Sequence, residues 1–115
     1  MSRKLDTAIA ELLGYEVILE EREYGMRGNL YHIKTNNGRF KDLPHYRTDG
    51  NAMLELDKEM RERGWEVEIT YSLHFQKYIA KYYKPETRWR DYIGEAAGAP
   101  EAVAFAAYKA LTGKE

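Results

Sequence analysis

The chain has 115 residues, with 18 Lys or Arg against 19 Asp or Glu, so its formal net charge is −1. The absence of cysteine excludes disulfides and cysteine-ligated zinc. The balanced charge argues against a nucleic-acid partner, which normally requires a clear positive excess. This length is typical of one domain, which we expect to span residues 1–115. The polar start of the chain and the lack of a long apolar run predict no membrane partner and a cytoplasmic location.

The first half of the chain predicts one helix followed by strands. Leu5, Ile9 and Leu13 recur at helical spacing, and Gly14 is a natural helix end. The sequence Asn36-Asn37-Gly38 suits the positive φ angles of a tight hairpin turn. The predicted elements are a helix over 3–13, a strand over 15–21 and a hairpin with strands over 30–35 and 39–43.

The second half predicts two more helices and three strands. An apolar stripe at Met53, Leu56 and Met60 indicates a helix that begins near Thr48 or Asp49. Strict alternation of apolar and polar residues from position 65 onward is typical of a strand. The last helix is nearly all Ala, Val, Phe and Leu, so it should be the most buried of the three. The predicted elements are a helix over 48–63, strands over 65–71, 76–83 and 88–94, and a helix over 100–111.

This order of elements predicts an α+β fold. Long alternating strands without intervening helices indicate a mainly antiparallel β-sheet. The apolar faces of that sheet must be covered, so we expect the three helices to pack on them. The predicted architecture is a helix–sheet–helix (α-β-α) sandwich.

Three stretches of the chain resemble one known family. They are the helix from Leu5 to Gly14, the segment Pro44-His45-Tyr46-Arg47-Thr48-Asp49 with the later Arg63-Gly64-Trp65, and the C-terminal block from Ala99-Pro100-Glu101 to Leu111. Together they resemble the phage ABA sandwich domain, a family of small bacteriophage proteins. The resemblance implies an α-β-α sandwich and a phage or prophage origin, with no catalytic residue to carry over. One departure is the polar face of residues 65–71, which suits an edge strand or a sheet open on one side.

The resemblance implies a biological setting rather than a reaction. Some small phage proteins sequester nucleotide immune signals, including cyclic dinucleotides, in aromatic and arginine-lined pockets between subunits. By that analogy we expect a non-catalytic anti-defence sponge in the host cytoplasm that binds a phosphorylated small molecule. The ten tyrosines and the small size favour a homo-oligomer. The alternatives are a protein–protein interaction or scaffold module, a single-stranded nucleic-acid binder and an enzyme without a familiar motif.

The first candidate ligand site is the segment His45-Tyr46-Arg47-Thr48, which ends where a helix begins. Amide groups at a helix N-terminus lack intrahelical partners and favour anions, phosphate above all. Arg47 and these amides could therefore hold a phosphate while Tyr46 stacks on a base. The alternative is that Thr48 or Asp49 only caps the helix, since the carboxylate of Asp49 competes for the same amides.

The second candidate site lies within residues 76–92, where five basic residues and two acidic ones are interleaved with aromatic rings. Aromatic planes next to cations can stack nucleobases. The predicted ligand-binding residues here are Tyr82, Arg88, Trp89 and Arg90. The alternative is a pair of strands whose aromatic rings pack in the core while the cations stay in water.

Motifs for metal binding, cofactor binding and covalent catalysis are missing from the sequence. The three histidines, His32, His45 and His74, have neither His-x-His nor His-x3-His spacing. The two serines, Ser2 and Ser72, lie in no Gly-x-Ser-x-Gly sequence. The glycines form no phosphate-binding loop and no dinucleotide fingerprint. We therefore expect no metal, no cofactor and no catalytic residue.

Overall fold

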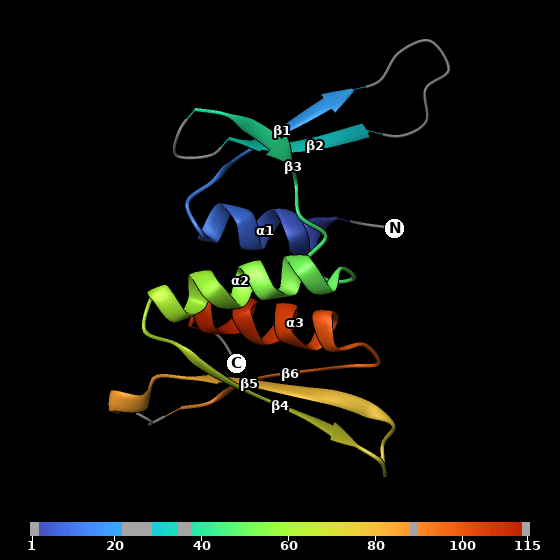
Figure 1. Cartoon of the computed structure of the whole chain (residues 1–115), viewed down its shortest axis with the longest axis vertical. Coiled ribbons are helices and arrows are strands. Elements are labelled where there is room, and N and C mark those ends of the chain that lie inside the picture. The colour runs from blue at the N-terminus through green and yellow to red at the C-terminus, as the bar shows by residue number, and fades with distance from the viewer. Residues whose placement is uncertain (1–2, 22–28, 35–37, 88–89, 114–115) are drawn as a thin grey trace.

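The residues described form three helices that lie between two three-stranded antiparallel sheets (Figure 1). The computed structural model describes residues 3–21, 29–34, 38–87 and 90–113. The elements in chain order are α1 Lys4–Leu12, β1 Glu16–Glu21, β2 Asn29–Lys34, β3 Phe40–Asp42, α2 Gly50–Glu62, β4 Glu66–Ser72, β5 Lys77–Tyr83, the 3₁₀ turn η1 Pro85–Thr87, β6 Tyr92–Ala96 and α3 Ala99–Thr112. Within that part of the chain, no helix is both long and apolar enough to cross a membrane.

Each sheet is built from strands that are neighbours in the sequence. The first has the order β1-β2-β3 and the second β4-β5-β6, and all pairs are antiparallel. In Figure 1 the first sheet lies above α1, and the second lies below α3 at the other end of the 49 Å long axis. This confirms the α+β class, the antiparallel strands and the three helices.

The order of the layers differs from the expected sandwich, because helices lie between sheets rather than a sheet between helices (Figure 1). The physical reason is the composition of α3, which is apolar on most of its circumference and needs cover on both sides. Helices α1 and α2 contact it on one side, and strands β5 and β6 on the other. Its buried residues are Ala102, Val103, Ala104, Ala106, Ala107 and Ala110, which confirms that it is the most buried helix.

Strand β6 and helix α3 approach each other closely at Gly94. A Cβ atom at this position would lie 2.5 Å from the backbone N of Ala106 and 2.8 Å from Cβ of Phe105. The predicted strand over 88–94 ends at this glycine, whereas β6 runs from Tyr92 to Ala96 and contains it. Gly94 is therefore a packing position within the strand rather than a strand end.

The predicted ends of the first two helices are confirmed. Asp49 precedes α2 in extended conformation, and its carboxylate accepts a hydrogen bond of 3.0 Å from the Asn51 amide. Gly14 and Gly64 follow α1 and α2 with φ angles of +96° and +89°, which glycine adopts at low cost. The predicted hairpin is also present, with β2 antiparallel to β3, although positions 36 and 37 of its turn lie outside the residues described.

Candidate functional site

The segment before α2, which contains the first candidate site, is tied to α3 through Arg47. Its Nε and Nη2 atoms both donate to Oε2 of Glu101, at 3.0 and 2.6 Å. The two side chains are only 24% and 30% exposed. Glu101 lies in the first turn of α3, where a carboxylate interacts favourably with the helix dipole. The guanidinium is thus neutralised by a carboxylate of the same chain.

The same segment is also tied to α1 through Asp6. Asp6 is 4% exposed, and its carboxylate accepts a hydrogen bond from the Arg47 amide at 3.2 Å. It also accepts from Nε of Arg3 at 3.1 Å. Nη2 of Arg3 in turn donates to the carbonyl oxygens of Leu43 and Pro44, at 2.7 and 2.9 Å. These bonds fix the path of the chain into α2.

Three of the backbone amides at this helix start already have acceptors. The amides of Thr48 and Asp49 donate to the carbonyl of His45, at 3.1 and 2.9 Å, and the Asn51 amide donates to Asp49. Tyr46 is 1% exposed, and burial raises the pKa of its hydroxyl. Stacking of a base on Tyr46 is therefore wrong for this structure, and the capping alternative is confirmed.

His45 and Thr48 are exposed, so these two predicted residues reach the surface. The guanidinium expected to bind an anion beside them belongs to Arg47, and it is already bound to Glu101. An anion at this helix start would therefore have to compete with Glu101 for Arg47.

The second candidate site is divided between core and surface. Tyr82 is 0% exposed, and its hydroxyl donates to Oδ1 of Asp57 at 3.0 Å. Burial, followed by the charge of Asp57, raises the pKa of this hydroxyl. Base stacking on Tyr82 is therefore also wrong, and its packing in the core is confirmed. Arg90 is exposed, whereas Arg88 and Trp89 lie outside the residues described.

A carboxylate with a shifted pKa lies on α2, beside Tyr15 in the link that follows α1. Burial raises the pKa of Glu59, whose Oε1 accepts a hydrogen bond of 3.0 Å from the Tyr15 hydroxyl. Nη1 of Arg63 lies 3.8 Å from the same oxygen. A shifted carboxylate can mark a catalytic site, but this one is already bound by neighbours of its own chain. Within the described ranges, no three His, Asp or Glu side chains are grouped as a metal ion would require.

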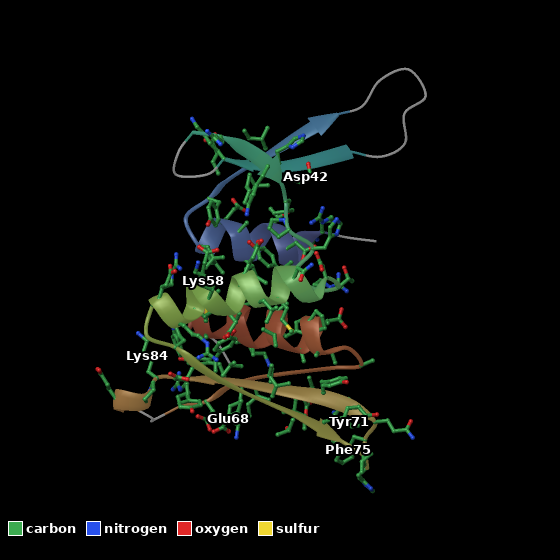
Figure 2. All side chains as sticks on the ribbon, viewed as in Figure 1. Asp42, Lys58, Glu68, Tyr71, Phe75 and Lys84 are labelled. Atoms are coloured by element: carbon green, nitrogen blue, oxygen red, sulfur yellow. The ribbon has the colours of Figure 1, made fainter. Side chains whose placement is uncertain are left out.

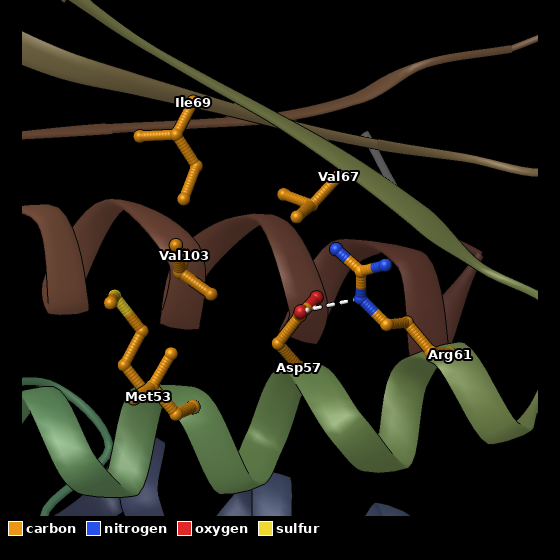
Figure 3. Close-up of a pocket in the computed structure, with 7 residues that line it drawn as sticks. Met53, Asp57, Arg61, Val67, Ile69 and Val103 are labelled. Carbon is orange, nitrogen blue, oxygen red and sulfur yellow. Dashed lines mark hydrogen bonds and ion pairs between the residues drawn. The ribbon is translucent and has the colours of Figure 1, made fainter.

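A groove that the sequence analysis did not single out lies between α2 and β4. It has a volume of about 320 Å³, and none of the predicted ligand-binding residues that the structure describes lines it. Figure 3 shows Val67 and Ile69 pointing into it from β4, and an ion pair at one end between Arg61 Nε and Asp57 Oδ2, 2.7 Å apart. The lining residues are Met53, Leu54, Asp57, Arg61, Val67, Ile69 and Val103.

The groove continues into an unusually exposed set of apolar side chains, which we call the apolar strip. Among the described residues, its members are the five most exposed large hydrophobic side chains. Monomeric proteins rarely leave such side chains grouped on the surface without a binding role. Figure 2 shows Tyr71 and Phe75 together at the outer end of the lower sheet. The members and their exposed fractions are Leu73 84%, Phe75 65%, Leu54 62%, Tyr71 47% and Ile69 43%.

The turn that carries the outer part of the strip is held by specific contacts. The amide of Phe75 donates to Oγ of Ser72 at 3.2 Å. The Tyr71 ring contacts the Tyr78 ring edge-on, with centroids 4.9 Å apart. Nζ of Lys77 lies 5.3 Å from the centroid of the Phe75 ring. The apolar side chains are therefore presented to water by an ordered turn.

Strand β4 is an edge of its sheet, as the polar face of residues 65–71 suggested. In the part of the chain that the structure describes, β4 pairs with β5 alone, in a continuous register from Glu66 to Ser72. Exposed edges in proteins are commonly protected by charged side chains, lysine above all, by proline or by a bulge. The sequence of β4, Glu-Val-Glu-Ile-Thr-Tyr-Ser, contains two glutamates but no lysine and no proline.

Comparison with known proteins shows a similarity in structure. No family model matches the chain, and no curated protein matches it. A crystal structure of a phage protein from Bacillus cereus ATCC 14579 is similar, with a TM-score of 0.68 over 100% of this chain and 91% of that chain. The chain has the fold of a phage protein. The two sequences are 19% identical, so this likeness concerns the fold, and neither comparison assigns the chain to the phage ABA sandwich family.

Proposed function

We propose that this chain is a non-catalytic, phage-type interaction module that binds another polypeptide through the apolar strip. The observation that carries the proposal is the position of the five most exposed large apolar side chains among the described residues, which lie on one edge strand, in the turn that follows it and in the groove beside it. Edge strands and apolar grooves are two surfaces by which proteins recognise peptide segments.

The free energy available from this surface is substantial. Burying one Leu or Phe side chain stabilises a complex by about 1.5–3 kcal/mol. Leu73 and Phe75 are 84% and 65% exposed, so most of their surface is available to a partner. Because the turn is already ordered by Ser72 and Lys77, binding would restrict little additional motion.

The alternative proposal is sequestration of a phosphorylated small molecule, such as a cyclic nucleotide. It would require Arg47 to leave Glu101 and Tyr46 to leave the core. Both changes cost free energy before any ligand is bound. The apolar strip is therefore the better-supported binding surface, and nucleotide binding becomes an outcome of the test.

The test places a photoreactive phenylalanine analogue at position 75 and irradiates the protein in a lysate of phage-infected cells. We expect a covalent adduct with a specific polypeptide, which Leu73→Ser reduces strongly. Ile93→Ser is the matched control, because Ile93 is also exposed (41%) but lies on β6, outside the strip. An adduct that survives Leu73→Ser and is lost in the control would contradict the proposal.

A thermal-shift screen against nucleotides distinguishes the alternative. A ligand at one hundred times its dissociation constant stabilises a protein by about 2.7 kcal/mol, which raises Tm by several degrees in a domain of this size. We expect no shift from cyclic or linear nucleotides at millimolar concentration. A clear shift without any specific adduct at position 75 would replace the interaction module by the sponge.

A further inference from the structure

We infer that two copies of this chain pair through their β4 strands, antiparallel, with Ile69 opposite the partner's Ile69, to form one six-stranded sheet. This inference rests on the proposed function, since it names the polypeptide that covers the apolar strip. It follows from the regular free edge of β4, the charge pattern of this strand and the position of its apolar residues.

The two edges of the lower sheet differ in their capacity to accept a strand. Strand β4 has seven residues in continuous register with β5, so its free edge is regular. Strand β6 has five residues, and Gly94 lies at its centre, packed against α3. A long and regular edge offers more backbone hydrogen bonds to an added strand. The free edge of β4 is therefore the better docking site.

The faces of β4 restrict how two copies can align. Val67 and Ile69 point toward the helices and line the groove. Glu68 lies on the opposite face of the sheet, away from the helices (Figure 2). In a two-fold antiparallel pair, both apolar faces lie on the same side only when a residue stands opposite its own copy. The possible centres of symmetry are thus single residues of the strand.

The acidic residues of β4 select among these centres. A centre at Val67 would place Glu66 opposite the partner's Glu68, and a centre at Glu68 would place Glu68 opposite itself. Like charges directly opposite each other are destabilising. A centre at Ile69 instead places Glu66 opposite Ser72 and Glu68 opposite Thr70. This centre also pairs all seven residues of the strand, whereas a centre at Thr70 pairs fewer.

The same register matches the apolar residues. Ile69 meets the partner's Ile69, and Val67 meets the partner's Tyr71 on both sides of the axis. One step beyond the strand ends, Leu73 comes to the level of the partner's Trp65. The most exposed apolar residue of the chain thus gains an apolar neighbour, and the partner strand closes the open side of the groove beside Leu54.

A lysine and a glutamate that each already have a partner in their own chain can also approach each other across the new junction. The glutamate is Glu66, whose Oε2 lies 3.9 Å from Nη1 of Arg61. Lys77 stands opposite Ser72 in the β4–β5 register, and its Nζ lies 3.2 Å from Oε2 of Glu95. The partner's Glu66 would lie on the other side of Ser72, on the same face of the sheet. The distance between alternate strands, about 9.6 Å, can be spanned by a lysine and a glutamate side chain extended toward each other. A second copy is therefore the occupant that we assign to this edge.

The absence of native cysteine allows a direct test of the register. Cα atoms directly opposite each other in antiparallel strands lie about 4.5–5.5 Å apart, within the about 4.4–6.8 Å range that a disulfide requires. We expect Ile69→Cys to form an intermolecular disulfide rapidly under mild oxidation. A mixture of Val67→Cys and Tyr71→Cys proteins should form the mixed disulfide. The control, Ile93→Cys, should form an intermolecular disulfide much more slowly than Ile69→Cys.

The mass of the unmodified chain in solution provides the second measurement. By analytical ultracentrifugation from micromolar to millimolar concentration, we expect twice the 13.5 kDa of one chain. Ile69→Lys, which places two lysines at the axis, should raise the dissociation constant of the dimer about tenfold or more. Ile93→Lys is the control and should leave it unchanged. Circular dichroism checks that both variants are folded.

The outcomes separate this inference from the proposed function. A monomer at millimolar concentration, or a dimer in which Ile69→Cys gives no disulfide, overturns the β4 pairing. If position 75 of such a protein still cross-links to another polypeptide, the proposed function stands with a different partner. If it gives no adduct at all, the proposed function is overturned as well.

Discussion

Nη2 of Arg47 lies 2.6 Å from Oε2 of Glu101, so the loop before α2 is bound to the first turn of α3. The two residues are 54 positions apart in the sequence. Because both side chains are mostly shielded from water, the pair should contribute more than a typical surface ion pair.

A double-mutant cycle with Arg47→Ala and Glu101→Ala measures this contribution. We expect a coupling free energy of about 1 kcal/mol from urea unfolding, in the range for hydrogen bonds between charged groups that are partly exposed. The control pair is Lys41 and Glu55, 3.6 Å apart with side chains 45% and 60% exposed. Its coupling should stay below about 0.5 kcal/mol. Equal coupling in both pairs would contradict the role of burial.

The hydroxyl of Tyr82 should contribute to stability through Asp57. Tyr82→Phe keeps the buried ring but removes the 3.0 Å hydrogen bond, so we expect a loss of about 1–2 kcal/mol in the free energy of unfolding. Tyr71→Phe, at an exposed ring, should change it by less than about 0.5 kcal/mol. A Tyr82→Phe protein as stable as the wild type would show that Asp57 is fully satisfied by Arg61.

Gly94 should not tolerate even the smallest side chain. Gly94→Ala would place a methyl group against the backbone of α3, and such overpacking costs about 1–3 kcal/mol. Gly50→Ala is the control, because no heavy atom lies within 4 Å of its added Cβ. The control should be neutral or stabilise by up to about 1 kcal/mol. Urea unfolding of both variants decides whether the close approach limits position 94.

Glu59 should make stability depend on pH. Its folded-state pKa lies above the usual 4.5, so the Glu59 carboxylate binds a proton more tightly in the folded chain than in the unfolded chain. The associated stability is fully present below the unfolded pKa and is lost as the pH rises through the folded pKa. Since Glu59→Gln cannot titrate, its stability relative to the wild type should be greater at about pH 7 than at about pH 4.

Urea unfolding at the two pH values measures the difference in stability between Glu59→Gln and the wild type. Groups that titrate equally in both proteins do not contribute to this difference. Glu55→Gln is the matched control for removing a carboxylate from the same helix, because the Glu55 side chain is 60% exposed. A Glu59→Gln difference that is constant, or larger at the acidic pH, would contradict the raised pKa.

The secondary structure could be predicted because its signals are local. The apolar stripe of α2 and the glycines after α1 and α2 are visible in a few neighbouring residues. The alternation around Ile69 likewise predicted the strand, and an edge position was one of the two interpretations of its polar face. The layer order could not be predicted in this way, because a pattern shows which face is apolar but not which element covers it.

The ligand-binding residues were predicted incorrectly for the same physical reason: local sequence does not show which distant residues will contact them. A helix start next to Arg47 looks like an anion site until Glu101, which is distant in sequence, is placed beside it. Tyr82 was assigned to either the core or a ligand, and only contact with Asp57 on α2 decided between them. One signal for the apolar strip was present in the sequence, since Leu73 and Phe75 are large apolar residues between two predicted strands.

The central position of α3 has a consequence for the dynamics of the chain. Its backbone amides are shielded by helices on one side and by strands on the other, whereas each sheet has one face at an end of the molecule (Figure 1). Local openings that expose a strand need not disturb α3, but exposing α3 requires the layers to separate. In deuterated water, its amide protons should therefore be the last to exchange, at a rate set by global unfolding.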